Sequence, residues 1–115
     1  MGNNKPKYQH HDLANGRWFE LDFMEQMANV GSEVERTIAW KEKGDNEYSQ
    51  KAFERALELL DLTIEDIKNK SKLKEIVRLR EVLVDYFFSE NQYGSSNQLW
   101  HNYFYAFNFA ARKNR

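Results

Sequence analysis

The stretch from Arg17 to Lys43, RWFELDFMEQMANVGSEVERTIAWKEK, decides the fold of this chain. Its apolar residues recur in steps of three or four, at Phe19, Phe23, Met27, Val30, Val34 and Ile38. Those steps keep all six on one stripe of an α-helix, and such a stripe must be buried against other elements. Gly31 lowers helix propensity within this stretch, so we expect another backbone to approach closely there.

A second helix is expected after Gly44, which suits the left-handed end of the first. Asp45 or Asn46 can cap it by accepting a hydrogen bond from a free backbone N–H. Its apolar stripe comprises Phe53, Leu57, Leu60, Ile64 and Ile67. The polar residues 69–71 predict its end or a bend.

Two further amphipathic stretches follow. The third covers roughly residues 72–90, with Leu73, Ile76, Leu79, Leu83 and Phe87 on one face. The fourth begins with Ser95 and Gln98, which have the spacing of a capping box. It is rich in aromatic residues on nearly all sides, so we expect that either its neighbours bury it or part of it is an interface.

The predicted fold class is therefore all-α, an antiparallel up-down four-helix bundle over residues 17–115. The length of 115 residues fits one domain. Residues 1–16 contain the only proline, Pro6, and show no sustained period. We expect them to form a flexible N-terminal arm.

Composition excludes several classes of protein. Apolar residues make up 41%, charged residues 30%, and the net charge is −1, which is typical of a globular domain and gives no general attraction to polyanions. The chain has no cysteine, so disulfides and thiolate metal sites are excluded. It has no apolar signal core and no run long enough to span a bilayer, so we expect a cytoplasmic protein that does not enter membranes.

Catalytic and cofactor motifs are also missing from the sequence. A bundle di-metal site needs a glutamate three residues before a histidine on each of two helices, and His10, His11 and His101 all lack it. There is no nucleophile elbow, and the five glycines are too scattered for a phosphate loop. We therefore expect no cofactor, no metal and no enzymatic activity.

One polar group stands out within the third helix. Its members are Arg78, Arg80, Glu81 and Asp85, and Arg36 of the first helix is a fifth candidate. Arg80 and Asp85 fall among apolar residues, where a charge must be paired or lie at the surface. One interpretation is an ion pair with Glu33 or Arg36 that fixes the helix register. The other is a polar pocket or a partner-binding patch.

The fourth helix carries the candidate partner surface: Trp100, Tyr105, Phe109, Arg112 and Lys113. Surplus aromatic surface on a small domain favours self-association, so we expect a homo-oligomer, with a protein partner as a further prediction. Aromatic rings beside cations can also stack bases, so RNA or DNA is a third candidate partner.

One stretch combines three features in order: an amphipathic helix, a short glycine-containing break, and a second helix with the pattern of small residues and leucines AFERALELL. Its sequence is MEQMANVGSEVERTIAWKEKGDNEYSQKAFERALELLDLTI. In this it resembles small four-helix-bundle proteins related to the ribosomal RNA intervening-sequence family, which include the accessory variability determinants of diversity-generating retroelements. The resemblance implies a non-enzymatic, ring-like homo-oligomer that binds nucleic acid or a reverse transcriptase. Those rings are markedly basic, whereas this chain is nearly neutral, so no binding residue is carried over.

The layout is also similar in shape to the HEPN family of helical ribonucleases. Their chemistry needs an arginine and a histidine separated by four to six residues. Arg78 and Arg80 are followed by VLVDYFF without a histidine, and no arginine precedes His101 at that distance. The sequence thus predicts a non-catalytic assembly or binding protein, an accessory to nucleic-acid processing. The alternative is a HEPN-like or ligand-binding bundle with a polar pocket around Arg78, Arg80, Glu81 and Asp85.

Overall fold

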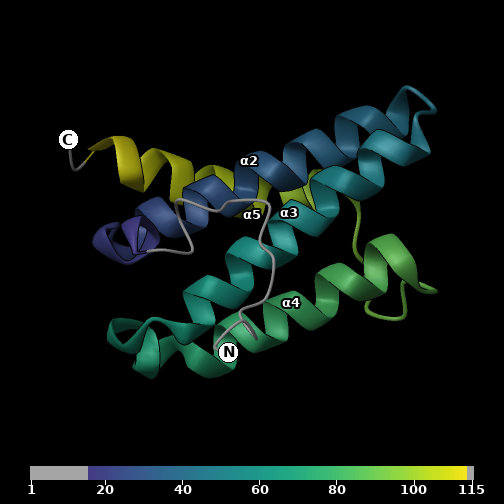
Figure 1. Ribbon diagram of the computed structural model, residues 1–115. Helices are drawn as coiled ribbons and strands as arrows, with labels where there is room; N and C mark the ends of the chain where they lie inside the picture. Colours follow the sequence, from purple (N-terminus) through teal and green to yellow (C-terminus); the bar gives the residue numbers. More distant parts are fainter. Residues whose placement is uncertain (1–15, 114–115) are drawn as a thin grey trace, which may run out of the picture.

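A computed structural model describes residues 16–113, and all regular elements within this range are helical. They are the 3₁₀-helix η1 (Arg17–Glu20), α2 (Phe23–Glu42), α3 (Asn46–Glu65), the 3₁₀-helix η2 (Ile67–Lys72), α4 (Leu73–Phe88) and α5 (Asn97–Lys113). The all-α prediction is confirmed. Each successive α-helix runs back across the view against the previous one (Figure 1). The predicted arm lies almost wholly outside the described residues.

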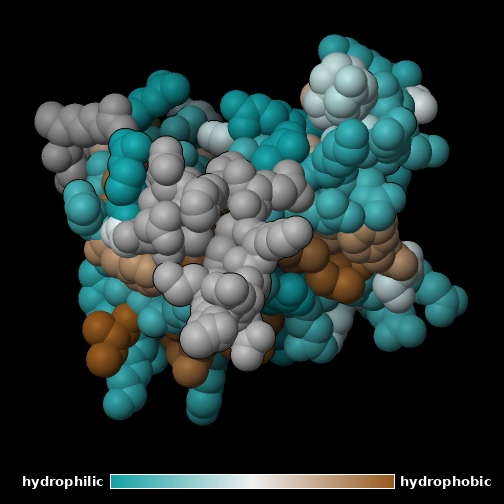
Figure 2. All heavy atoms as spheres, viewed as in Figure 1, coloured by the Kyte–Doolittle hydropathy of each residue, from teal (hydrophilic) through white to brown (hydrophobic). Residues whose placement is uncertain are grey.

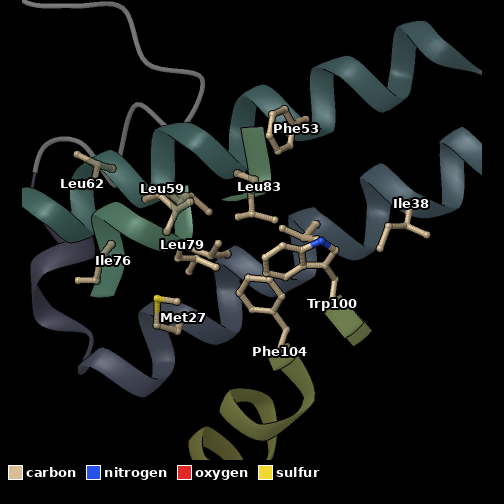
Figure 3. Close-up of a cluster of buried hydrophobic side chains, with 14 of the residues drawn as sticks. Met27, Ile38, Phe53, Leu59, Leu62, Ile76, Leu79, Leu83, Trp100 and Phe104 are labelled. Carbon is tan, nitrogen blue, oxygen red and sulfur yellow. The ribbon is translucent and has the colours of Figure 1, made fainter. Parts of the chain in front are cut away.

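The core draws on every α-helix. From α2 it takes Met27, Val30, Val34 and Ile38, which the periodicity predicted. Figure 3 shows Trp100 and Phe104 of α5 pointing into the cluster that also contains Leu79 and Leu83 of α4. The helices do not contact one another equally, because α2 packs along both α3 and α5, whereas α4 packs mainly against α3 and η2.

The first α-helix begins later than predicted. Its N-cap is Asp22, whose Oδ1 accepts from the Glu25 N–H at 2.8 Å, while Glu25 Oε1 accepts from the Asp22 N–H at 3.1 Å. This capping box ends the preceding 3₁₀ turn, whose shorter period changes which side chains face inward. Trp18 is therefore fully buried and Phe19 is 37% exposed, so the prediction that Phe19 joins the core is wrong.

The second α-helix begins as predicted but ends earlier. Asp45 Oδ1 accepts from the Tyr48 N–H at 3.0 Å and caps its start. Its last residue is Glu65, because Asp66 turns extended and its Oδ1 accepts from the Lys68 N–H at 3.1 Å. The helical period no longer applies beyond that point. Ile67, predicted in the core stripe, is 86% exposed.

The fourth predicted helix uses a different cap. Ser96, not Ser95, accepts from the Leu99 N–H, at 3.1 Å. The Ser95 N–H donates instead to Asn91 Oδ1 at 2.7 Å, and Gln98 bonds to Asn102. Asn91, with a φ of 55°, thus fixes the connecting loop and displaces the predicted Ser95–Gln98 capping box.

α5 approaches Gly31 closely, and the contact is made by the Phe104 side chain and not by the backbone that was predicted. A Cβ atom on Gly31 would lie 2.8 Å from the Cβ of Phe104. Such a distance is shorter than van der Waals contact, so any side chain here would force α5 away from α2.

A buried polar network ties η1 and η2 to the end of the bundle. Gln26 Nε2 donates to Asp66 Oδ2 at 2.8 Å and to the Trp18 carbonyl at 3.1 Å. Its Oε1 accepts from Asn69 at 2.8 Å. Trp18 Nε1 donates to Thr63 Oγ1 at 3.1 Å, so these buried polar groups have hydrogen-bond partners within the protein.

The network makes the stability of the fold pH-dependent. Burial by itself raises the pKa of Asp66, but hydrogen bonds from Lys68 and Gln26 outweigh it and hold that pKa below its usual 3.8. As the pH falls below about 4, the unfolded chain binds the proton first, and this group alone removes up to about 1.4 kcal/mol of unfolding free energy per pH unit. The loss stops once the pH passes below the folded-state pKa.

Urea unfolding between pH 5 and pH 2 checks this expectation. Asp66→Asn should be less stable than the wild type at pH 5 and should lose less stability on acidification. Equal pH slopes for the two proteins would contradict the assignment to Asp66.

The two buried tryptophans give a matched comparison. Trp18 and Trp100 are both almost fully buried, but within the described residues Trp100 Nε1 has no hydrogen-bond partner. Replacing either with phenylalanine removes the same atoms, and only Trp18→Phe breaks a hydrogen bond. We expect Trp18→Phe to cost about 1–2 kcal/mol more in unfolding free energy than Trp100→Phe. Equal costs in chemical denaturation would show that the Trp18–Thr63 bond adds nothing.

Candidate functional site

Three members of the predicted polar group meet at the loop after α4. Asp85 accepts backbone N–H bonds from Gln92 at 2.9 Å and from Tyr93 at 3.0 Å. Glu81 accepts from the Tyr93 hydroxyl at 2.7 Å, and the Arg78 guanidinium lies 5.0 Å from the centre of that ring. The bond to Glu81 raises the pKa of Tyr93 above its usual value. These side chains are thus engaged in holding the loop.

The two remaining arginines lie elsewhere. Arg80 Nε binds Asp61 of α3 at 2.8 Å, and Arg36 binds Glu33 within α2 at 3.1 Å. Arg80 is therefore paired, but its partner is Asp61 and not Glu33 or Arg36. The five candidates do not converge on one cavity, which the ligand-binding alternative requires.

The candidate partner surface on α5 separates into two parts. Trp100 is only 2% exposed and belongs to the core, because it shares a helix face with Phe104. Tyr105 is 68% exposed and Phe109 is 58% exposed. Their rings stack with centres 6.5 Å apart, one turn from each other. We call Tyr105 and Phe109, with the exposed Arg112 and Lys113 beside them, the α5 aromatic patch.

Two other exposed aromatic rings, those of Phe88 and Tyr48, pack against a second element. Figure 2 shows separate hydrophobic patches on a mainly hydrophilic face. Phe88 of α4 lies 5.0 Å from Phe53 of α3, centre to centre, beside a hollow of about 200 Å³. Tyr48 likewise contacts Trp40 of α2. Within residues 16–113, the ring contacts of Tyr105 and Phe109 are only with each other.

A groove between α2 and α5 adjoins the α5 aromatic patch. Its main hollow, of about 250 Å³, is lined by Ala28, Gly31, Ser32, Glu35, His101, Phe104, Tyr105 and Asn108. A second hollow of about 170 Å³ shares Ala28, Ser32 and Asn108 and adds Glu25, Asn29, Ala111 and Arg112. The small side chains of Ala28 and Ser32 leave this space beside Phe104, which covers Gly31. We call the two hollows together the α2–α5 groove.

A histidine–carboxylate pair closes one end of the groove. His101 Nδ1 lies 2.6 and 2.7 Å from the two oxygens of Glu35, and both side chains are half-buried. When Nδ1 donates to Glu35, Nε2 is left as an acceptor, as in an acid–base dyad. The hydroxyl of Ser32, which lines the same groove, donates to the Ala28 carbonyl at 3.2 Å. The groove therefore holds an oriented imidazole without an activated hydroxyl.

Sequence reasoning did not find this pair. In the sequence, neither Glu35 nor His101 belongs to a recognisable motif. The two residues are 66 positions apart, and no local spacing signals their contact. The one available hint is their position beside the contact between Gly31 and Phe104. Glu35 lies one turn after Gly31 in α2, and His101 lies one turn before Phe104 in α5.

Two further observations concern metals and membranes. Across residues 16–113, no three histidine, aspartate or glutamate side chains lie close enough together to hold a metal ion. In the same range, every helix is too short or too polar to cross a lipid bilayer.

Comparison of the chain with models of protein families, with curated proteins and with solved structures finds no match. The resemblance to the intervening-sequence group stays a prediction.

Proposed function

We propose that this chain is a non-catalytic assembly protein whose copies associate through the α5 aromatic patch. The proposal places it in the cytoplasm as an accessory to a larger system. The observation that carries it is the exposure of the stacked Tyr105 and Phe109 rings, on a helix whose core-facing side buries Trp100, Phe104 and Ala111. Paired exposed rings flanked by an arginine have the composition of interface hot spots.

The charges along the groove favour a protein partner over nucleic acid for this surface. Arg112 and Lys113 could contact phosphates, and Tyr105 could stack a base. Glu25 and Glu35 line the neighbouring groove, however, and would repel a polyanion that ran along it. RNA, DNA or a reverse transcriptase would then bind the assembled protein at another surface.

Self-association is tested by sedimentation velocity over a concentration series. The wild-type mass should rise above the 13.8 kDa of one chain as concentration increases. Phe109→Asp should remove the largest apolar contact and leave the protein at the mass of one chain, with unchanged helicity by circular dichroism.

Leu99→Asp is the matched control. Leu99 is also an exposed apolar residue of α5, but it lies ten residues before Phe109, almost three turns along the helix, and about 120° around it from Tyr105. This variant should associate like the wild type. A Phe109→Asp protein that also associates like the wild type would contradict the proposal. A parallel salt series with single-stranded RNA should show no binding that depends on Arg112 or Lys113.

A further inference from the structure

We infer that the α2–α5 groove receives the Phe109 ring of a second copy of this chain, carried on an α5 helix that runs antiparallel to the first. This inference rests on the proposed function and deepens it, because it names the receiving surface and the register. Both the ring and the groove lie on described residues of the same two helices.

Size supports this occupant. The main hollow of about 250 Å³ is larger than the roughly 150 Å³ of a protein cavity that holds one benzene molecule. On the α2 side its lining includes the small residues Ala28, Gly31 and Ser32, and Ala28 and Ser32 leave room for a phenyl ring beside Phe104. Tyr105 forms one wall and offers an aromatic face to an entering ring.

Charge supports the antiparallel direction. Glu35 lies at the end of the groove near the first half of α5, whereas the last turn of α5 carries Arg112 and Lys113. If Phe109 of one copy lies beside Tyr105 of the other, Arg112, one turn further on, reaches the level of His101 and Glu35. A parallel arrangement would instead place the two basic turns side by side.

Symmetry then limits the assembly to two chains. Each copy offers one ring and one groove on the same helix pair, so a two-fold axis satisfies both at once. The interface is closed, and no ring or groove is left over to extend it into a filament. Glu25 and Glu35 also disfavour an anionic small molecule or a nucleic-acid strand as the occupant.

Plugging the groove tests the receiving surface. Ser32 is exposed, and its hydroxyl bonds only within its own helix, so Ser32→Phe should fold normally and fill the hollow. We expect this variant to raise the dimer dissociation constant about 100-fold, as loss of a hot spot does. Ser32→Ala keeps the groove open. Its dissociation constant should stay within about threefold of the wild-type value, a much smaller effect than the loss of a hot-spot residue.

A mixing experiment tests the direction. Glu35→Arg and Arg112→Glu should each weaken self-association, since each places like charges together in an antiparallel dimer. Mixed in equal amounts, the two variants should form a heterodimer as strong as the wild-type dimer, because each mixed contact then pairs opposite charges. A parallel pair cannot show this rescue.

The outcomes separate the two proposals. A wild-type protein that stays at one chain's mass at every concentration overturns both. Wild-type association that is lost in Phe109→Asp but kept in Ser32→Phe overturns the groove and leaves the α5 aromatic patch as the interface. Loss in both variants, with rescue on mixing, supports the groove and its register. Loss in both without rescue overturns the antiparallel direction.

Discussion

Gln26→Leu is expected to lower the free energy of unfolding by about 3 kcal/mol, a large part of the stability of a domain of this size. Leucine nearly matches glutamine in volume, so the core loses little packing. The change removes partners from three buried groups: the Trp18 carbonyl, the Asp66 carboxylate and the Asn69 amide. Each of the three groups keeps its other hydrogen bonds. The loss of unfolding free energy is therefore smaller than if all three groups had no partner.

Asn29→Leu is the control for Gln26→Leu. It makes the same kind of change in α2, one turn away, but at an exposed position where Asn29 bonds only to the Glu25 carbonyl. We expect a change within about 0.5 kcal/mol by urea denaturation. If Gln26→Leu were as mild as Asn29→Leu, the polar network would not hold η1 and η2 in place.

Gly31→Ala is expected to destabilise the protein by about 2 kcal/mol through overpacking, although alanine is the better helix former. In an exposed helix the same change would stabilise by about 1 kcal/mol. Here the new Cβ would meet Phe104 at 2.8 Å, and α5 would have to move outward. Movement of α5 should also loosen the Glu35–His101 contact and widen the α2–α5 groove.

Ala39→Gly provides the comparison for helix propensity. Ala39 is exposed on α2, so this change should cost the ordinary amount of about 1 kcal/mol. Destabilisation by both variants would mean that contact with α5, and not propensity, selects glycine at position 31. A Gly31→Ala protein more stable than the wild type would contradict the close packing of α5 on α2.

Periodicity predicted those parts of the fold in which one regular helix continues. Met27, Val30, Val34 and Ile38 are buried because successive turns of α2 repeat the same geometry. It was wrong where the backbone changes type, at the 3₁₀ turns that expose Phe19 and Ile67. The sequence does contain a signal for each boundary, because an aspartate that caps the next helix stands there: Asp22 before α2 and Asp66 before η2.

The candidate site was less predictable because it depends on contacts between distant residues. The exposure of Tyr105 and Phe109 agrees with an aromatic helix that cannot be buried on every side. The spacing of four between Trp100 and Phe104 could have assigned Trp100 to the core. The Glu35–His101 contact joins two helices whose relative rotation no local pattern specifies.

Sedimentation equilibrium of the wild-type chain tests the central claim most directly. The protein concentration should run from about 1 to about 500 µM, so that a weak dimer is detected. An interface formed by one helix face buries less than the 1,200–2,000 Å² of standard complexes, so we expect weak association. Association through α5 predicts an average mass that rises from 13.8 kDa toward twice that value and stops there. A mass that remains at 13.8 kDa throughout the range would contradict it.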